Sequence, residues 1–124
     1  MLKKGLVLAV VTATSIVTSL TIGPNEAIAH HGWSEYNNQQ TLNLTGEIRS
    51  VSYSNPHVTI QLQTAKKAWL AVLAPPSRMQ RRGLPAEGLR VGQRVRVVGY
   101  PNRSESNEMR AERIVIGDRT VELR

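Results

Sequence analysis

Short segments that alternate apolar and polar residues constrain the fold of this chain more than any other feature. Val58, Ile60 and Leu62 alternate with polar neighbours, which is the pattern of a strand with one buried face. Residues 41–53 begin with the same alternation and then shift it by one position, as a β-bulge does. The pattern predicts a long, bent first strand and a short second strand, separated by a turn at Ser54-Asn55-Pro56.

Further strands are expected after a hairpin loop. Residues 69–74 are almost wholly apolar, so both faces of this third strand should be covered. Residues 94–97 and 109–116 alternate again, and the second of these segments changes parity near Glu112, which predicts a second bulge. A short alternation at residues 121–123 predicts a terminal strand.

The connection between the third and fourth strands contains the one helix that the sequence predicts. Pro75 and Pro76 end the strand, Ser77 is a suitable N-cap, and Gly83 can close a helix of about two turns. Three strands, a short helix and two more strands are in the order of a five-stranded Greek-key barrel of the OB type. We therefore predict an all-β fold with one short helix, a small OB-like barrel, with a small open β-sandwich as the alternative.

The beginning of the chain has the three parts of a secretory signal peptide. Lys3 and Lys4 precede an apolar run from Leu6 to Ile22, and Ala27-Ile28-Ala29 is a small-x-small cleavage site. Serines and threonines interrupt the apolar run and no basic cluster follows it, which disfavours a membrane-spanning helix. We expect a cleaved signal peptide at 1–29, an N-terminal arm at 30–40 and an OB-like β-barrel domain at 41–124. The product should be periplasmic or secreted, with no transmembrane anchor after cleavage.

The three histidines of the chain are His30, His31 and His57. Cleavage after Ala29 would make His30 the first residue, so that its freed α-amine and its imidazole could both bind one metal ion. Amine and imidazole nitrogens suit copper and zinc. We therefore predict a metal site at the three histidines; the alternative is that His57 only caps its strand or hydrogen-bonds the turn and that the terminal histidines are disordered.

The chain is strongly basic, with 16 Lys and Arg against 9 Asp and Glu and a net charge of +7, and most of the excess lies in its second half. A basic surface attracts anionic ligands or partner proteins. The residues predicted to hold such a partner are Arg78, Arg81, Arg82, Arg94 and Arg96. The alternative interpretation is a solvated arginine-rich surface.

Several segments taken together resemble one known family. They are His30-His31-Gly32, the bent strand 42–51, Ser54-Asn55-Pro56-His57-Val58, Ala74-Pro75-Pro76-Ser77 and Val91-Gly92-Gln93-Arg94-Val95. Their order resembles the bacterial exported family catalogued as domain of unknown function 6152. The resemblance implies a signal peptide and a small β-barrel-like domain, and it marks His30, His31, Asn55, Pro56 and His57.

The chain departs from that family at one position. Members often carry an aspartate after the aromatic residue that follows the histidine pair, whereas here Asn37 follows Tyr36. This departure removes a candidate anionic metal ligand.

Other classes of function find little support in the sequence. The chain has no cysteine, no Gly-x-Ser-x-Gly elbow and no phosphate-binding loop, so we do not expect an enzyme. The second strand offers Thr59, Gln61 and Gln63 where a nucleic-acid-binding barrel would present aromatic platforms, which disfavours nucleic acid. Trp33, Tyr36 and Tyr53 could line a ligand groove, but the chain has no Phe, so we expect these few aromatic residues to fill the core.

The sequence thus predicts an exported small binding domain. Its first candidate ligand is copper or zinc, bound through the mature N-terminal histidines. The alternative is an envelope adaptor that binds an anionic partner through the arginine-rich half.

Overall fold

The computed structural model describes residues 32–124 together with Gly5 and Ala9, so the predicted signal peptide, His30 and His31 lie outside the described residues. The strands are β1 (Leu42–Ser52), β2 (Thr59–Gln63), β3 (Ala68–Val72), β4 (Arg94–Pro101), β5 (Glu108–Ile116) and β6 (Arg119–Glu122). The helical segments are η1 (Trp33–Glu35), α2 (Pro76–Arg81) and η2 (Ala86–Gly88). In the described part of the chain, no helix has the length and apolar character needed to cross a membrane.

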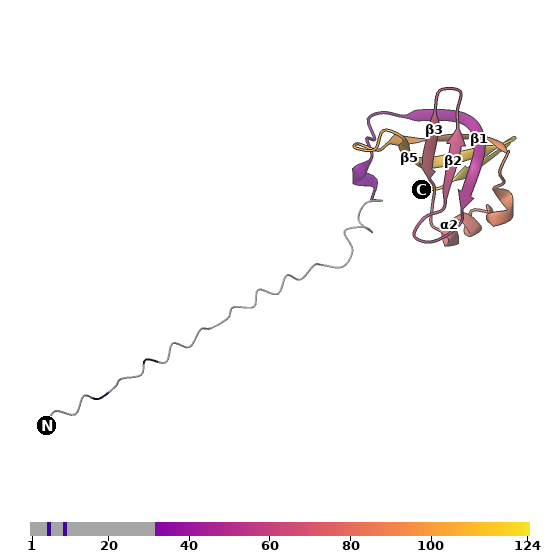
Figure 1. Ribbon diagram of the computed structural model, residues 1–124. Helices are drawn as coiled ribbons and strands as arrows, with labels where there is room; N and C mark the ends of the chain where they lie inside the picture. The colour runs from indigo at the N-terminus through magenta and orange to yellow at the C-terminus, as the bar shows by residue number, and fades with distance from the viewer. Residues whose placement is uncertain (1–4, 6–8, 10–31) are drawn as a thin grey trace.

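The strands form a closed barrel of five strands with β6 added at its side (Figure 1). Antiparallel pairing gives the order β3-β2-β1-β4-β5-β6, and β3 also pairs with β5 in parallel. This last pairing joins the two ends of the five-stranded sheet, which a small open β-sandwich would leave apart. The predicted OB-like barrel is therefore confirmed.

Both predicted bulges are present. Ile48 pairs with Leu62 and Ser50 with Gln61, so Arg49 is the additional residue in β1. In β5 the additional residue is Glu112, because the partners of Val98 and Gly99 are Arg113 and Ala111. Each bulge bends its strand and moves the apolar positions to the other parity, so the barrel interior stays apolar on both sides of the bend.

The barrel core consists of the inward residues of the strands, and α2 covers one end of it, opposite the β2–β3 hairpin (Figure 1). Met79 of α2 and Leu84 after it are fully buried, as is Leu123 at the end of the chain. The helix begins at Pro76, with Pro75 as its N-cap and no side-chain cap. The prediction of Ser77 as N-cap was wrong, because proline already suits the first helical position through its fixed φ.

The N-terminal arm packs against the outside of the barrel. Tyr36 bridges to Asn102, and the Asn37 N–H donates to the Pro101 carbonyl at 2.9 Å. Val72 is next to the core residue Ala71 and so points to the outer face, yet it is fully buried. The outer face of the barrel is therefore covered along β3 and β5, and this cover creates the environment described next.

Candidate functional site

Arg110 is the one buried charged residue among the residues that the structure describes, with 4% of its surface exposed. Its neighbours Met109 and Ala111 belong to the barrel core, so alternation along β5 points Arg110 to the outer face. Its partner across the parallel pairing is the buried Val72. An outward position that is nevertheless buried marks a second, smaller packed layer outside the barrel.

Trp33 in η1 lies against two arginines. The guanidinium carbons of Arg110 and Arg124 are each 4.6 Å from the centre of the indole ring. Tyr100 meets the same ring edge-on, with ring centres 6.2 Å apart and an interplanar angle of 72°. Each cation–π contact is worth about 0.5–2 kcal/mol, with the higher value for a desolvated pair such as Trp33–Arg110. The contacts fasten the arm to β5 and to the end of the chain.

His57, from the turn between β1 and β2, approaches the other side of Arg110. Its Nε2 is 3.3 Å from Arg110 Nη2. A guanidinium has no acceptor, so Arg110 donates and Nε2 accepts with its lone pair. A neutral imidazole has only one such lone pair, and in this arrangement that lone pair already accepts the hydrogen bond from Arg110.

Arg78 of α2 and Arg82, the C-cap residue directly after this helix, reach the same region. Arg78 Nη1 donates to the Leu123 carbonyl oxygen at 3.3 Å, and Arg82 Nη2 donates to the backbone oxygen of Arg124 at 3.1 Å. Burial lowers the pKa of Arg110, and the positive charge of Arg78 lowers it further. Guanidinium groups remain charged at neutral pH despite such shifts. We call Arg78, Arg82, Arg110 and Arg124 the arginine cluster.

The two carboxylates beside this region have their own partners. Glu108 Oε2 accepts hydrogen bonds from the Tyr36 hydroxyl and from Asn102 Nδ2, both at 2.8 Å. Glu112 Oε2 accepts one from the Tyr100 hydroxyl at 2.9 Å, and this bond raises the pKa of Tyr100. Glu112 Oε1 also lies 3.7 Å from Arg124 Nη1, so it offsets part of the charge of one arginine.

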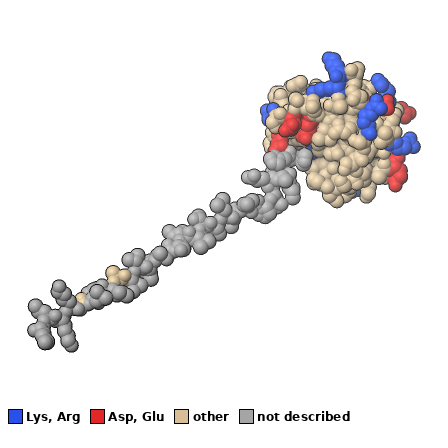
Figure 2. Space-filling view, in the orientation of Figure 1, with Lys and Arg blue, Asp and Glu red and all other residues tan. Residues whose placement is uncertain are grey.

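The five arginines predicted to bind an anion fall into two groups. Arg78 and Arg82 belong to the arginine cluster, and Arg81, the last residue of α2, is exposed. Arg94 and Arg96 instead lie exposed on β4, where their partners across the ladder with β1 are Glu47 and Thr45. On the face shown in Figure 2, lysine and arginine side chains gather toward the upper and right edges, and most of the rest of that face is uncharged.

Arg110 and Arg124 were missed by the sequence analysis. Arg110 occupies an ordinary outward position of an alternating strand, and only the arm, which comes from the other end of the chain, buries it. The one signal that could have pointed to it is an aromatic-containing arm that needs an outer surface to pack on.

The predicted metal site lies partly outside the described residues, because neither His30 nor His31 is described. His57 is placed, and its described contact is with Arg110. Within residues 32–124, no three potential metal-ligating side chains come together. Of the aromatic residues, Tyr36 is buried in the outer layer, Tyr53 packs on the core and Trp33 is partly buried between the two arginines.

Comparisons with known proteins support the family and the fold. The model of a family of unknown function, DUF6152, matches residues 17–110. No curated protein matches the chain. Among solved structures, the ZRD-deleted mutant of TiaS in complex with agmatine has a TM-score of 0.51 and 17% identity, over 70% of this chain and 27% of that chain. A complex of TiaS with a transfer RNA and ATP has a TM-score of 0.47 and 22% identity, over 72% of this chain and 20% of that chain. The chain thus spans only a minor part of these proteins, and the first likeness indicates a shared fold alone.

Proposed function

This chain belongs to the DUF6152 family of unknown function, and we propose that it is an exported small binding domain for an anionic ligand. The observation that carries the proposal is the arginine cluster. One of its members, Arg110, is 4% exposed and is held between Trp33 and His57. We place the ligand at the outer face where α2, β5 and the end of the chain meet.

The chemistry of this face favours an anion with several oxygens. Guanidinium groups bind carboxylates and phosphates through paired hydrogen bonds, and stacking on Trp33 restricts the orientation of Arg110 and Arg124. Grouped positive charges repel one another, and a bound anion would relieve that repulsion.

We propose binding rather than catalysis because the described site lacks an activated group. His57 is the obvious candidate for a general base, but the lone pair of its Nε2 accepts a hydrogen bond from Arg110. Glu108 and Glu112 likewise accept hydrogen bonds or pair with cations. An anionic envelope component is therefore a better match than a substrate to be transformed.

Titration of the purified protein with inorganic tripolyphosphate, followed by calorimetry, tests the anion site. Arg82→Gln and Arg124→Gln should each weaken binding by about threefold to tenfold, and raising the salt concentration should weaken it further. Both residues are exposed, so the barrel should remain folded. The matched control is Arg90→Gln, an exposed arginine in the turn before β4, which should leave the affinity unchanged. Equal effects at all three positions, or no binding by the native chain, would contradict the proposal.

A second candidate function is the binding of copper or zinc by His30, His31 and His57. The observation that favours it is a path of two contacts. Trp33, only three residues after His30, contacts Arg110, and Arg110 contacts His57. Three residues span at most about 10 Å, so the α-amine of a cleaved chain would begin close to this path. His57 would have to give up its hydrogen bond with Arg110 before its Nε2 could bind a metal.

Copper titration of the processed chain, followed by tryptophan fluorescence, tests this candidate. One residue added before His30 should weaken binding by about tenfold or more, because it displaces the α-amine from the ligand set. His57→Ala should also weaken it if His57 is a ligand. Affinities that are unchanged by both alterations would overturn the metal candidate without affecting the anion site.

A further inference from the structure

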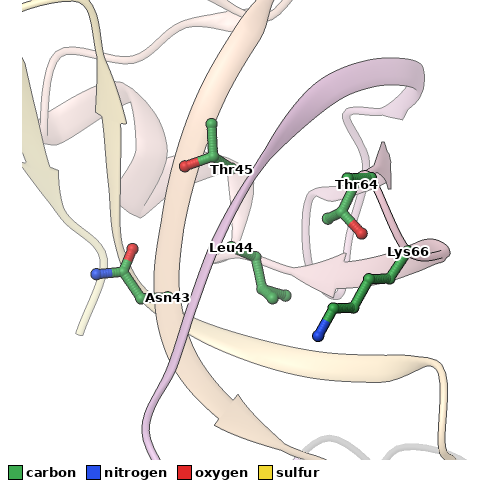
Figure 3. A pocket seen from close by; sticks show the side chains of 6 residues that line it. Asn43, Leu44, Thr45, Thr64 and Lys66 are labelled. Carbon is green, nitrogen blue, oxygen red and sulfur yellow. The ribbon is translucent and has the colours of Figure 1, made fainter.

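A hollow of about 280 Å³ lies beside the first half of β1, away from the arginine cluster. It is lined by Asn43, Leu44 and Thr45 of β1 and by Thr64, Ala65 and Lys66 of the β2–β3 hairpin (Figure 3). Its volume is slightly below the range of about 300–1,000 Å³ that is usual for pockets that enclose small molecules. A short segment of chain fits such a shallow hollow better than an enclosed cofactor does.

The hollow borders a strand edge that the barrel leaves unpaired. β4 pairs with β1 from Leu42 to Glu47, whereas the pairing of β2 with β1 begins only at Glu47. The residues of β1 before Glu47 therefore have a ladder partner on one side only. On the other side β2 turns away into the hairpin loop at Thr64.

The direction of the main-chain groups follows from Ile48. Its N–H donates to the Gln93 carbonyl at 2.9 Å and its carbonyl accepts from the Gly92 N–H at 2.8 Å, so Ile48 faces the β4 side. In an antiparallel ladder this direction alternates from one residue to the next, and the register from Leu42 to Glu47 is unbroken. The N–H and carbonyl groups of Asn43 and Thr45 therefore point away from β4 and toward the hollow.

The side chains around the hollow select for negative charge. Lys66 is exposed, and its ammonium group extends across the hollow toward Leu44 (Figure 3). On the other side of β1, Arg96 Nη1 lies 3.4 Å from Asn43 Oδ1. Leu44 adds an apolar surface between these two cations.

We propose that this edge binds an extended acidic peptide, which adds to β1 as a further strand. The main-chain groups of Asn43 and Thr45 would bond to the backbone of the peptide, and Lys66 would pair with one of its carboxylates. Recognition of this kind takes its affinity from main-chain hydrogen bonds and its selectivity from the side chains beside the edge. The site is independent of the arginine cluster.

A fluorescein-labelled peptide with alternating glutamate and valine tests the proposal by fluorescence anisotropy, with a lysine–valine peptide of the same length for comparison. Thr45→Pro removes an N–H that faces the hollow but none that faces β4, and it should weaken binding by about tenfold or more. Thr45→Val keeps that N–H and should bind as the native chain does. Lys66→Glu should weaken binding of the acidic peptide and strengthen binding of the basic one.

Several results would overturn the proposal. One is equal binding by the Thr45→Pro and Thr45→Val variants, each shown to be folded by circular dichroism. Another is an affinity that depends on Arg82 and Arg124 and not on Lys66, which would assign the peptide to the arginine cluster. A third is concentration-dependent dimerisation that Thr45→Pro abolishes, because the occupant of the edge would then be a second copy of this chain.

Discussion

At the scale of single residues, Tyr36 connects the N-terminal arm to the outer face of the barrel. It is 1% exposed, and its hydroxyl donates to Glu108 at 2.8 Å. Burial raises the pKa of Tyr36 well above its ordinary value of 10.0, and the hydrogen bond and charge of Glu108 raise it further. A group whose folded pKa is raised adds stability that is complete below its unfolded pKa and is lost as pH rises through the folded pKa.

Tyr36→Phe should therefore lower the free energy of unfolding by about 1–2 kcal/mol at neutral pH, because a buried hydrogen bond is lost. Above pH 10.0, the ordinary pKa of the phenol, the difference between the two proteins should shrink by about 1.4 kcal/mol per pH unit. Urea unfolding of both proteins from pH 7 to about pH 11 measures this. Tyr53 and Tyr100 are present in both proteins, so they do not affect the difference. A difference that stays constant with pH would show that Tyr36 is not the titrating group.

At the scale of elements, the backbone of β5 leaves no room for a side chain at Gly99 of β4, beside the bulge at Glu112. A Cβ built on Gly99 would lie 1.9 Å from the Arg110 carbonyl oxygen, which is far inside van der Waals contact. Gly99 thus permits the strand approach that positions Arg110 at the outer face. The bulge and this glycine lie at the same place in the ladder, because the pairing register changes between Val98 and Gly99.

Gly99→Ala should separate β4 from β5 locally and lower the free energy of unfolding by about 3 kcal/mol or more. Gly117→Ala is the control, because a Cβ there meets no atom within 4 Å and the cost of its positive φ of 61° is about 1–2 kcal/mol. Thermal unfolding of both variants provides the comparison. A loss at Gly99 no larger than the loss at Gly117 would contradict the prediction, because the close approach would then be relieved by small local shifts.

At the scale of the whole molecule, export and processing remain the expectation on which the metal candidate depends. The cleavage site Ala27-Ile28-Ala29 predicts a mature chain that starts at His30. Intact-mass analysis of the periplasmic fraction should find that product, and Ala29→Leu should reduce cleavage because the site requires a small residue. A full-length product held in the membrane would contradict export and remove any role for a terminal amine.

Local patterns in the sequence were enough to predict the elements of the barrel. Alternation fixes which face of a strand is buried, so the changes of parity predicted one bulge between Ile48 and Val51 and another near Glu112 without any knowledge of the partner strands. The structure places these bulges at Arg49 and Glu112. The proline pair and Gly83 likewise marked the limits of the α2 segment. These features depend on neighbours within a few residues, and for that reason they can be read in order along the chain.

Which residues form the candidate site depends on contacts between distant parts of the chain. The β3–β5 pairing closes the barrel, and the arm then covers β5, so that Arg110 becomes buried beside Trp33 and His57. The sequence singled out Arg94 and Arg96, but the structure places them on β4, opposite Glu47 and Thr45 of β1 and apart from the arginine cluster. The sequence around an outward-facing strand residue does not indicate which other segment covers that residue in the folded protein. Only the tertiary structure could decide which arginines share a surface, because that depends on how strands far apart in the chain are joined.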